Sequence, residues 1–213
     1  MPIPAIAPYA MPLDADLPVN VPGWRADRRR AVVLVHDMQR YFLSFFPPDK
    51  PPVTDLLGNI ARIRRRAAAL RIPVVYSAQH PMTRAERGLL VDVWGAGMGE
   101  DPAQRELVPE VGRRPGDPVT IKRRYSAFHR TDLDATMGDL GRDQLIVCGV
   151  FAHIGCLFTA GDAYARDLET FFVADAVADF SARHHRMAVD YVAALCAVTL
   201  TTHRLLADLS APE

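Results

Sequence analysis

Six short apolar runs alternate with longer segments along the chain. They occupy residues 31–35, 73–78, 118–121, 144–150, 170–174 and 197–201. A short continuous apolar run with many β-branched side chains is typical of a strand that is buried on both faces of a parallel sheet. We therefore predict six strands at these positions.

Two of the segments between the runs have the three- to four-residue apolar spacing of a helix. The first extends from Thr54 to Leu70 and leaves an arginine-rich outer face, residues 64–66, which we expect to be exposed. The second extends from near Ser181 to Leu195. Strands that alternate with helices require crossover connections. This predicts an α/β fold: a three-layer α/β/α sandwich, Rossmann-like, around a mostly parallel six-stranded sheet.

The remaining segments predict one domain with an extended arm. Residues 1–30 are rich in proline, which favours an arm that lies over a folded body. Residues 81–117 have no clear periodicity and are long enough to cover a site. We expect residues 1–213 to form a single domain.

Composition and charge narrow the possible partners. Lys and Arg total 25 and Asp and Glu total 25, so the net charge is zero and no basic surplus favours nucleic acid. The three cysteines form no Cys-x-x-Cys pair, which indicates a reducing compartment. No apolar run approaches the roughly 20 residues that span a bilayer, and the N-terminus lacks the basic segment of a secretion signal. We expect a cytoplasmic enzyme or binding protein with no membrane partner.

Polar residues follow several of the predicted strands. Asp37, Gln79, Lys122 and the segment 151–156 are placed in this way. Ligands of open α/β sheets bind beyond the carboxyl ends of the strands, so these groups could converge on one small anionic molecule. Spacing alone leaves alternatives open. Asp37 also fits a helix cap or a turn, and Lys122 also fits a surface lysine on an edge strand.

Five groups of segments together resemble the isochorismatases. They are residues 36–39 with 41–42, 87–90 with 94–95, 122 with 124–128, 149–156, and 173–176 with 178–181. The resemblance extends to about Leu206 and includes relatives that act on 2-amino-2-deoxyisochorismate in phenazine-type pathways. Some isochorismatases carry an aryl carrier domain after the catalytic domain, and we expect none in this chain.

The resemblance implies hydrolysis of the enolpyruvyl vinyl ether of isochorismate, which gives 2,3-dihydroxy-2,3-dihydrobenzoate and pyruvate for siderophore or other aryl-acid biosynthesis. It implies that Asp37 is the general acid and Lys122 a second catalytic residue, with no covalent intermediate and no cofactor. Superfamily members that cleave acyl bonds have a cysteine at the position of Gly155. Cys156 follows one residue later, which on a helix turns its side chain by about 100°.

Asp37 needs a proton for this chemistry, although the ordinary pKa of an aspartate is about 3.9. A neighbouring Lys122 ammonium would favour the ionised carboxylate. We therefore expect Asp37 to take up its proton mainly when the dicarboxylate substrate binds.

The resemblance also implies a set of substrate-binding residues: Gln79 and Arg87 for polar groups, Phe42, Trp94 and Phe151 as apolar walls, and Gly155 through its backbone. Two residues depart from the family pattern. Phe151 replaces a common tyrosine, which affects the positioning of water, and Arg123 replaces a common tryptophan. Residues 77–81 lack the Asp-x-His motif of metal-dependent nicotinamidases, so we predict no metal site.

Other functions remain open. The first is hydrolysis of 2-amino-2-deoxyisochorismate to trans-2,3-dihydro-3-hydroxyanthranilate. The second is a non-catalytic binding protein on the same fold, and the third is an amidase that uses Cys156. Because relatives commonly form dimers, the resemblance implies a homodimer, with the proline-rich arm as a candidate interface.

Overall fold

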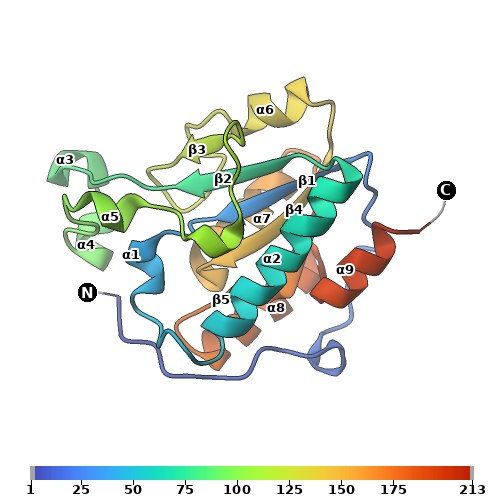
Figure 1. The fold of residues 1–213 in the computed structure, drawn as a ribbon, viewed down its shortest axis with the longest axis horizontal. Helices are drawn as coiled ribbons and strands as arrows, with labels where there is room; N and C mark the ends of the chain where they lie inside the picture. The colour runs from blue at the N-terminus through green and yellow to red at the C-terminus, as the bar shows by residue number, and fades with distance from the viewer. Residues whose placement is uncertain (1–2, 212–213) are drawn as a thin grey trace.

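A computed structural model describes residues 3–211 and contains one six-stranded sheet (Figure 1). The strands are β1 (Ala31–His36), β2 (Val74–Ala78), β3 (Val119–Ile121), β4 (Gln144–Val150), β5 (Glu169–Ala178) and β6 (Val198–Leu200). Their order is β3-β2-β1-β4-β5-β6, and every neighbouring pair is parallel. The six predicted strands and the parallel sheet are confirmed.

Strand β5 is longer than the predicted 170–174, because the charged residue Asp175 ends the apolar run but not the strand. The strand continues to Ala178 through a register shift against β4 between Val147 and Gly149. The Asp175 carboxylate is satisfied within the fold, since Oδ1 accepts hydrogen bonds from the backbone N and hydroxyl of Thr202 at 2.6 and 2.8 Å.

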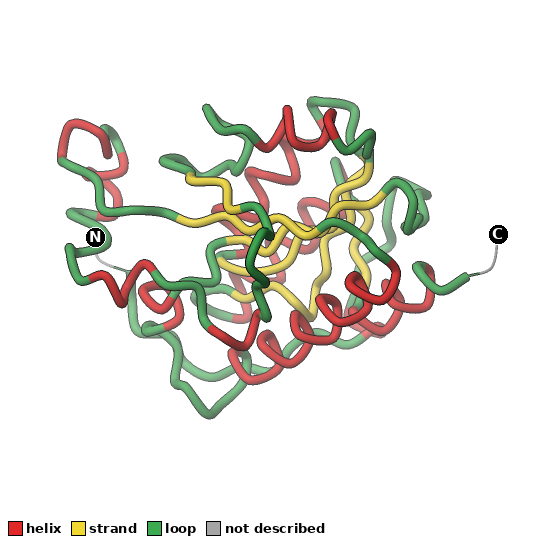
Figure 2. Tube along the Cα trace, turned by 45° about the horizontal axis from the view of Figure 1, so that its top comes forward, coloured by secondary structure: helices red, strands yellow, loops and turns green. Residues whose placement is uncertain are grey.

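Helices cover both faces of the sheet (Figures 1 and 2). One face carries α2 (Val53–Leu70) and α9 (Thr202–Asp208), and the other carries α6 (Leu133–Asp139), α7 (Leu157–Tyr164) and α8 (Ala182–Leu195). Each face buries its own apolar cluster against the strands. The two predicted helices are confirmed to within one residue at each end, and so is the three-layer sandwich. None of the helices within residues 3–211 is long and apolar enough to cross a lipid bilayer.

The expectation of an exposed arginine face is wrong for Arg64. This residue is buried, and it donates from Nε to the Tyr76 hydroxyl (2.9 Å) and from Nη2 to Asp117 Oδ2 (2.6 Å). The physical reason lies in helix geometry, because position 64 follows the buried Ile60 by four residues and lies on the same stripe. The neighbouring Arg65 is exposed as predicted.

Residues 81–117 contain short helices rather than a wholly irregular cover. They are α3 (Arg84–Arg87), α4 (Leu90–Trp94), α5 (Pro102–Arg105) and the 3-10 turn η2 (Pro109–Val111). With α1 (Arg40–Leu43), the helices α3, α4 and α5 gather at one end of the sheet, at the left of Figure 1. That end is where β1 and β2 have their carboxyl termini.

The arm lies along the folded body, as predicted. Ile6 is buried in the core, and the Tyr9 hydroxyl lies 3.1 Å from Nδ1 of His185. The Asn20 side chain exchanges hydrogen bonds with the backbone of Thr199 on the edge strand β6, at 3.0 and 2.7 Å. Side-chain pairing of this kind satisfies backbone groups that an edge strand would otherwise leave open.

Candidate active site

A pocket lies at the carboxyl ends of the strands and is enclosed by the short helices that follow them. Its lining combines a few charged side chains with many apolar and aromatic ones, a composition typical of small-molecule sites. All eight residues singled out from the sequence line it: Asp37, Phe42, Gln79, Arg87, Trp94, Lys122, Phe151 and Gly155. The predicted convergence of the strand ends is therefore present in the structure.

The Asp37 carboxylate is held by three side chains. Its Oδ2 lies 2.7 Å from Lys122 Nζ and accepts a hydrogen bond from Gln79 Nε2 at 3.1 Å. Its Oδ1 accepts from the Ser77 hydroxyl at 2.7 Å. Asp37 is only 3% exposed, so these contacts replace water as its hydrogen-bond partners.

The backbone at Asp37 turns sharply out of β1. Its φ is 50°, in the left-handed region that aspartate adopts more readily than most residues. The parallel register places His36 beside Ser77, and the Asp37 backbone N donates to the Ser77 carbonyl at 3.2 Å. The strand pairing and this turn together direct the carboxylate towards β2 and β3.

Lys122 is buried, although it follows the edge strand β3. It is 1% exposed, and Nζ donates to the backbone carbonyls of Arg124 (3.1 Å) and Tyr125 (3.3 Å) in addition to its contact with Asp37. These three contacts match the three donors of an ammonium group. The alternative of a surface lysine is therefore wrong.

The ion pair determines the charge of Asp37 in the free protein. Burial by itself raises the pKa of this carboxyl, because it disfavours the charged form. The Lys122 ammonium and the hydrogen bond from Ser77 outweigh burial, so the pKa of Asp37 lies below its ordinary value. The free protein therefore holds Asp37 as a carboxylate at neutral pH.

Cationic groups dominate the pocket. Its ionisable lining consists of Lys122, Arg87 and Arg124 against one carboxylate, Asp37, which leaves a net charge of +2. Arg87 is buried, and its Nε donates to the Gly95 carbonyl at 2.9 Å. Burial and the nearby Arg124 lower the pKa of Arg87. Such a pocket favours a ligand with two negative charges.

Gly97 makes room for the Arg87 guanidinium. A β-carbon at this position would lie 2.2 Å from Arg87 Nη1, closer than such atoms can approach, and φ at Gly97 is 78°. Gly97 lines the pocket next to Arg87.

Aromatic rings form the other wall. Phe151 contacts Phe42 edge to face, with centroids 5.9 Å apart, and contacts Phe180 at 4.6 Å. Trp94 packs against Phe180 at 5.7 Å and donates from its indole nitrogen to the Tyr125 hydroxyl at 2.7 Å. The pocket therefore combines a charged end with an apolar wall.

A family model for the isochorismatase domain matches residues 31–204. The chain belongs to the isochorismatase family.

Several relatives match over nearly the whole chain. A probable isochorismatase of Pseudomonas chlororaphis is 50% identical, over 96% of this chain and 98% of that protein. Phenazine biosynthesis protein PhzD of Pseudomonas fluorescens is 49% identical over the same shares. The isochorismatase of Bacillus subtilis is 47% identical over 98% of this chain and 67% of that longer protein.

Solved structures share the fold of this isochorismatase-family chain. A cysteine hydrolase from Pseudomonas syringae superposes with a TM-score of 0.80 at 22% identity, over 90% of this chain and 96% of its own. An isochorismatase-family protein from Burkholderia thailandensis superposes with a TM-score of 0.77 at 24% identity, over 86% of this chain and 97% of its own.

Cys156 does not line the pocket of this isochorismatase-family chain. It is fully buried in the core cluster on the α7 and α8 side, with Val32 and Leu34. Burial raises the pKa of the Cys156 thiol well above its ordinary value, so the thiol stays protonated. Gly155 carries no side chain, and it is the residue of this pair that lines the pocket.

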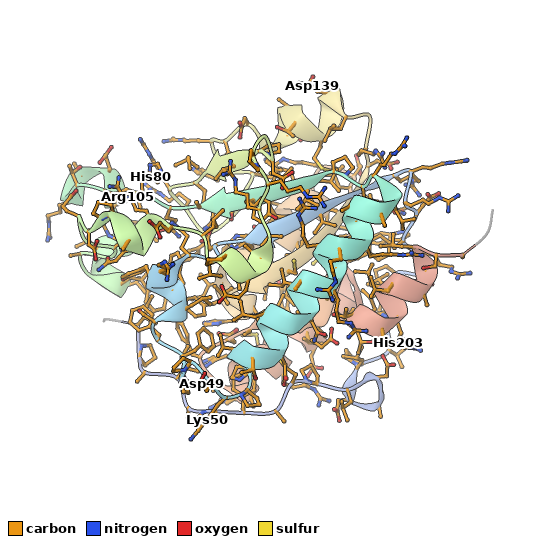
Figure 3. The ribbon with its side chains drawn as sticks, viewed as in Figure 1. Asp49, Lys50, His80, Arg105, Asp139 and His203 are labelled. Atoms are coloured by element: carbon orange, nitrogen blue, oxygen red, sulfur yellow. The ribbon has the colours of Figure 1, made fainter. Side chains whose placement is uncertain are left out.

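The histidines do not gather at one site, although the rings of His153 and His184 stack with their centroids 4.7 Å apart. His80 lies near α5 at one side of the molecule and His203 on α9 at the other (Figure 3). Within residues 3–211 no group of three histidine, cysteine, aspartate or glutamate side chains is placed to hold a metal ion.

Further pocket residues were not selected from the sequence: Ile3, Tyr41, Leu90, Gly97, Met98, Arg124, Tyr125, Val150, Ile154 and Phe180. Arg124, Tyr125 and Phe180 lie inside the segments that carry the resemblance, so a signal for them was present. Ser77, which bonds Asp37, is detectable only from the strand register. Ile3 comes from the arm, and no sequence pattern marks it.

We predict that Asp37 in the substrate-free protein stays ionised from pH 8 down to about pH 4.5, since its pKa lies below the ordinary value of about 3.9. The stability that this carboxylate contributes is present above that ordinary pKa and is lost as the pH falls through the lower folded-state pKa. The measurement is the ¹³C shift of the Asp37 carboxyl, assigned by comparison with the Asp37→Asn protein. A carboxyl that is already neutral at pH 7 would contradict this.

Proposed function

We propose that this protein hydrolyses the enolpyruvyl ether of isochorismate to 2,3-dihydroxy-2,3-dihydrobenzoate and pyruvate. The main supporting observation is the buried Asp37–Lys122 pair, at 2.7 Å, in a pocket whose net charge of +2 complements a dicarboxylate. Relatives named isochorismatase at 47% and 50% identity support the same substrate class.

In the proposed reaction, substrate binding brings two carboxylates into the cationic pocket. Their negative charge offsets the influence of Lys122 and Arg87, which raises the pKa of Asp37 and lets it take up a proton. Asp37 then protonates the methylene carbon of the enolpyruvyl group and leaves an oxocarbenium ion. Water adds to the cationic carbon, and the resulting hemiketal collapses to pyruvate and the ring alcohol.

Lys122 has two proposed roles in this step. It holds Asp37 through the 2.7 Å contact, and it stabilises the carboxylate that reforms as the proton leaves. Its contacts with the carbonyls of Arg124 and Tyr125 fix the ammonium, so little reorganisation accompanies proton transfer.

The substrate carboxylates are assigned to the arginine side of the pocket. Arg87 uses Nε for the Gly95 carbonyl, which leaves its two Nη groups for a carboxylate. Arg124 uses Nη1 for the Glu86 and Arg123 carbonyls, which leaves Nη2. Gln79 can bind a ring substituent, and Phe42, Trp94 and Phe151 would pack on the apolar faces of the substrate.

A second candidate substrate is 2-amino-2-deoxyisochorismate, which would give trans-2,3-dihydro-3-hydroxyanthranilate. Two relatives favour it, since the PhzD proteins of Pseudomonas fluorescens and Pseudomonas aeruginosa are 49% and 48% identical and are named for phenazine biosynthesis. The two compounds differ at one ring substituent, and the same proton transfer applies to both.

The proposed function predicts release of pyruvate when the purified protein is incubated with isochorismate. The measurement is coupled reduction of pyruvate, with each of the two compounds assayed separately. Turnover of the amino compound alone would assign the second candidate. Tight binding of both compounds without pyruvate would identify a non-catalytic binding protein and refute the proposal.

Asp37→Asn should lower kcat by about 10³-fold or more, because the amide keeps the shape of the carboxyl but cannot deliver a proton. Substrate binding, followed by calorimetry, should persist in that variant.

Lys122→Ala should impair both kcat and binding. Cys156→Ala is the matched control and should keep activity within about twofold, whereas its inactivation in a folded protein would favour a thiol mechanism.

We also propose a homodimer that uses α8 rather than the arm. Met187, Tyr191 and Leu195 recur every four residues and are each about half exposed, and Phe158 on the neighbouring α7 is exposed as well. An exposed apolar stripe of this kind is typical of a protein interface.

Light scattering should give about twice the chain mass of 23.6 kDa. Tyr191→Glu should halve that mass, because it places a charge within the stripe, whereas Leu13→Glu on the arm should not change it. A single-chain mass for the unmodified protein would contradict the homodimer.

We further propose that residues 1–213 act as one catalytic domain in the cytoplasm, without a nucleic-acid partner. All three cysteines are free and buried, which fits a reducing compartment, and the balanced charge offers no basic surplus for nucleic acid.

A further inference from the structure

His36 is the last residue of β1 and lies directly behind the proposed acid. It is fully buried, and its Nδ1 lies 3.8 Å from Asp37 Oδ2. Nδ1 also lies 2.8 Å from the Val150 carbonyl, which can only accept, so Nδ1 carries the proton and donates. Burial lowers the pKa of His36 to about 4, and the ring is therefore neutral at pH 7.

Two glycines make room for His36. A β-carbon on Gly149 would lie 2.1 Å from the His36 carbonyl oxygen. A β-carbon on Gly155 would lie 2.2 Å from Cε1 of the ring and 2.9 Å from Nε2. Atoms cannot approach this closely, so the imidazole occupies the space that any side chain at position 155 would need.

The remaining nitrogen of the ring makes no well-formed hydrogen bond among the described residues, although the backbone of the pocket-lining residue Tyr125 is near enough to the ring to oppose the lowering of the His36 pKa. Within residues 3–211, Nε2 of His36 is a buried polar side-chain atom without a hydrogen-bond partner. Leaving such an atom unpaired is destabilising, so an apolar residue of similar size would favour stability more. The imidazole is therefore better explained by the pocket than by the core.

The ring connects the acid to the pocket wall. Through Nδ1 it holds the Val150 carbonyl, and the next residue, Phe151, lines the pocket together with Gly155. His36 is also the residue directly before Asp37, where the backbone makes its left-handed turn.

We infer that His36 is a positioning residue: its ring keeps position 155 without a side chain, and its bond to Val150 holds the pocket wall against Asp37. His36 and Gly155 then form a coupled pair that reserves the space beside Asp37 for substrate and water. The inference rests on the proposed function only in its kinetic consequences, because the packing of the pair is independent of the substrate.

The first experiment measures the coupling by a double-mutant cycle. Gly155→Ala alone should lower the midpoint of thermal unfolding by several degrees and kcat/KM by more than tenfold. In a His36→Asn background, where the smaller side chain frees the space, the same substitution should change both by much less. Gly161→Ala on α7 is the matched control, since a β-carbon there meets nothing within 4 Å. Equal effects of Gly155→Ala in both backgrounds would overturn the inference, as would failure of the double variant to fold.

The second experiment separates positioning from packing. His36→Val removes the donor to Val150 and should lower kcat more than tenfold with KM within about twofold. His36→Asn keeps an N–H donor near the position of Nδ1 and should recover most of that loss. A His36→Val protein with unchanged kcat would overturn the positioning role. If the unmodified protein releases no pyruvate, the proposed function fails, while coupling in the unfolding midpoints still tests the pair.

Discussion

The contact between Asp37 and Lys122 is the interaction on which the site depends. The Asp37 carboxylate and the Lys122 ammonium are both buried, and Oδ2 lies 2.7 Å from Nζ. Each charged group has further hydrogen-bond partners. Without those partners, burial of either charge would destabilise the fold by several kcal/mol. Lys122 also holds Asp37 as an anion, whereas the proposed reaction needs Asp37 to act as an acid.

The sheet topology explains how this pair forms. Asp37 follows the central strand β1, Gln79 follows β2 and Lys122 follows β3, so three neighbouring parallel strands end at the same point. The β4 end supplies a turn with no side chain at Gly155, which the His36 ring requires. The short helices at this end then add the arginines and the aromatic wall. In the proposed reaction, the positive charge for the dicarboxylate and the space for water therefore come from different parts of the fold.

Much of this arrangement could be predicted from the sequence, and the failures have physical reasons. Continuous apolar runs identified the strands, and the strand-end rule placed Asp37, Gln79 and Lys122 together. The expectation that Arg64 is exposed is wrong, because Tyr76 and Asp117 compensate the burial of its charge. Ser77 and Ile3 depend on strand register and on the path of the arm, and local sequence encodes neither.

The central claim is that Asp37 transfers a proton directly to the methylene carbon of the bound vinyl ether. The most direct measurement is a crystal structure of the Asp37→Asn protein with isochorismate, in which the reaction is stopped before proton transfer. The account predicts that the residue 37 side chain lies within about 3.5 Å of the methylene carbon, the distance of a near-attack geometry. A methylene carbon well beyond that distance, with another acidic group beside it, would contradict the account.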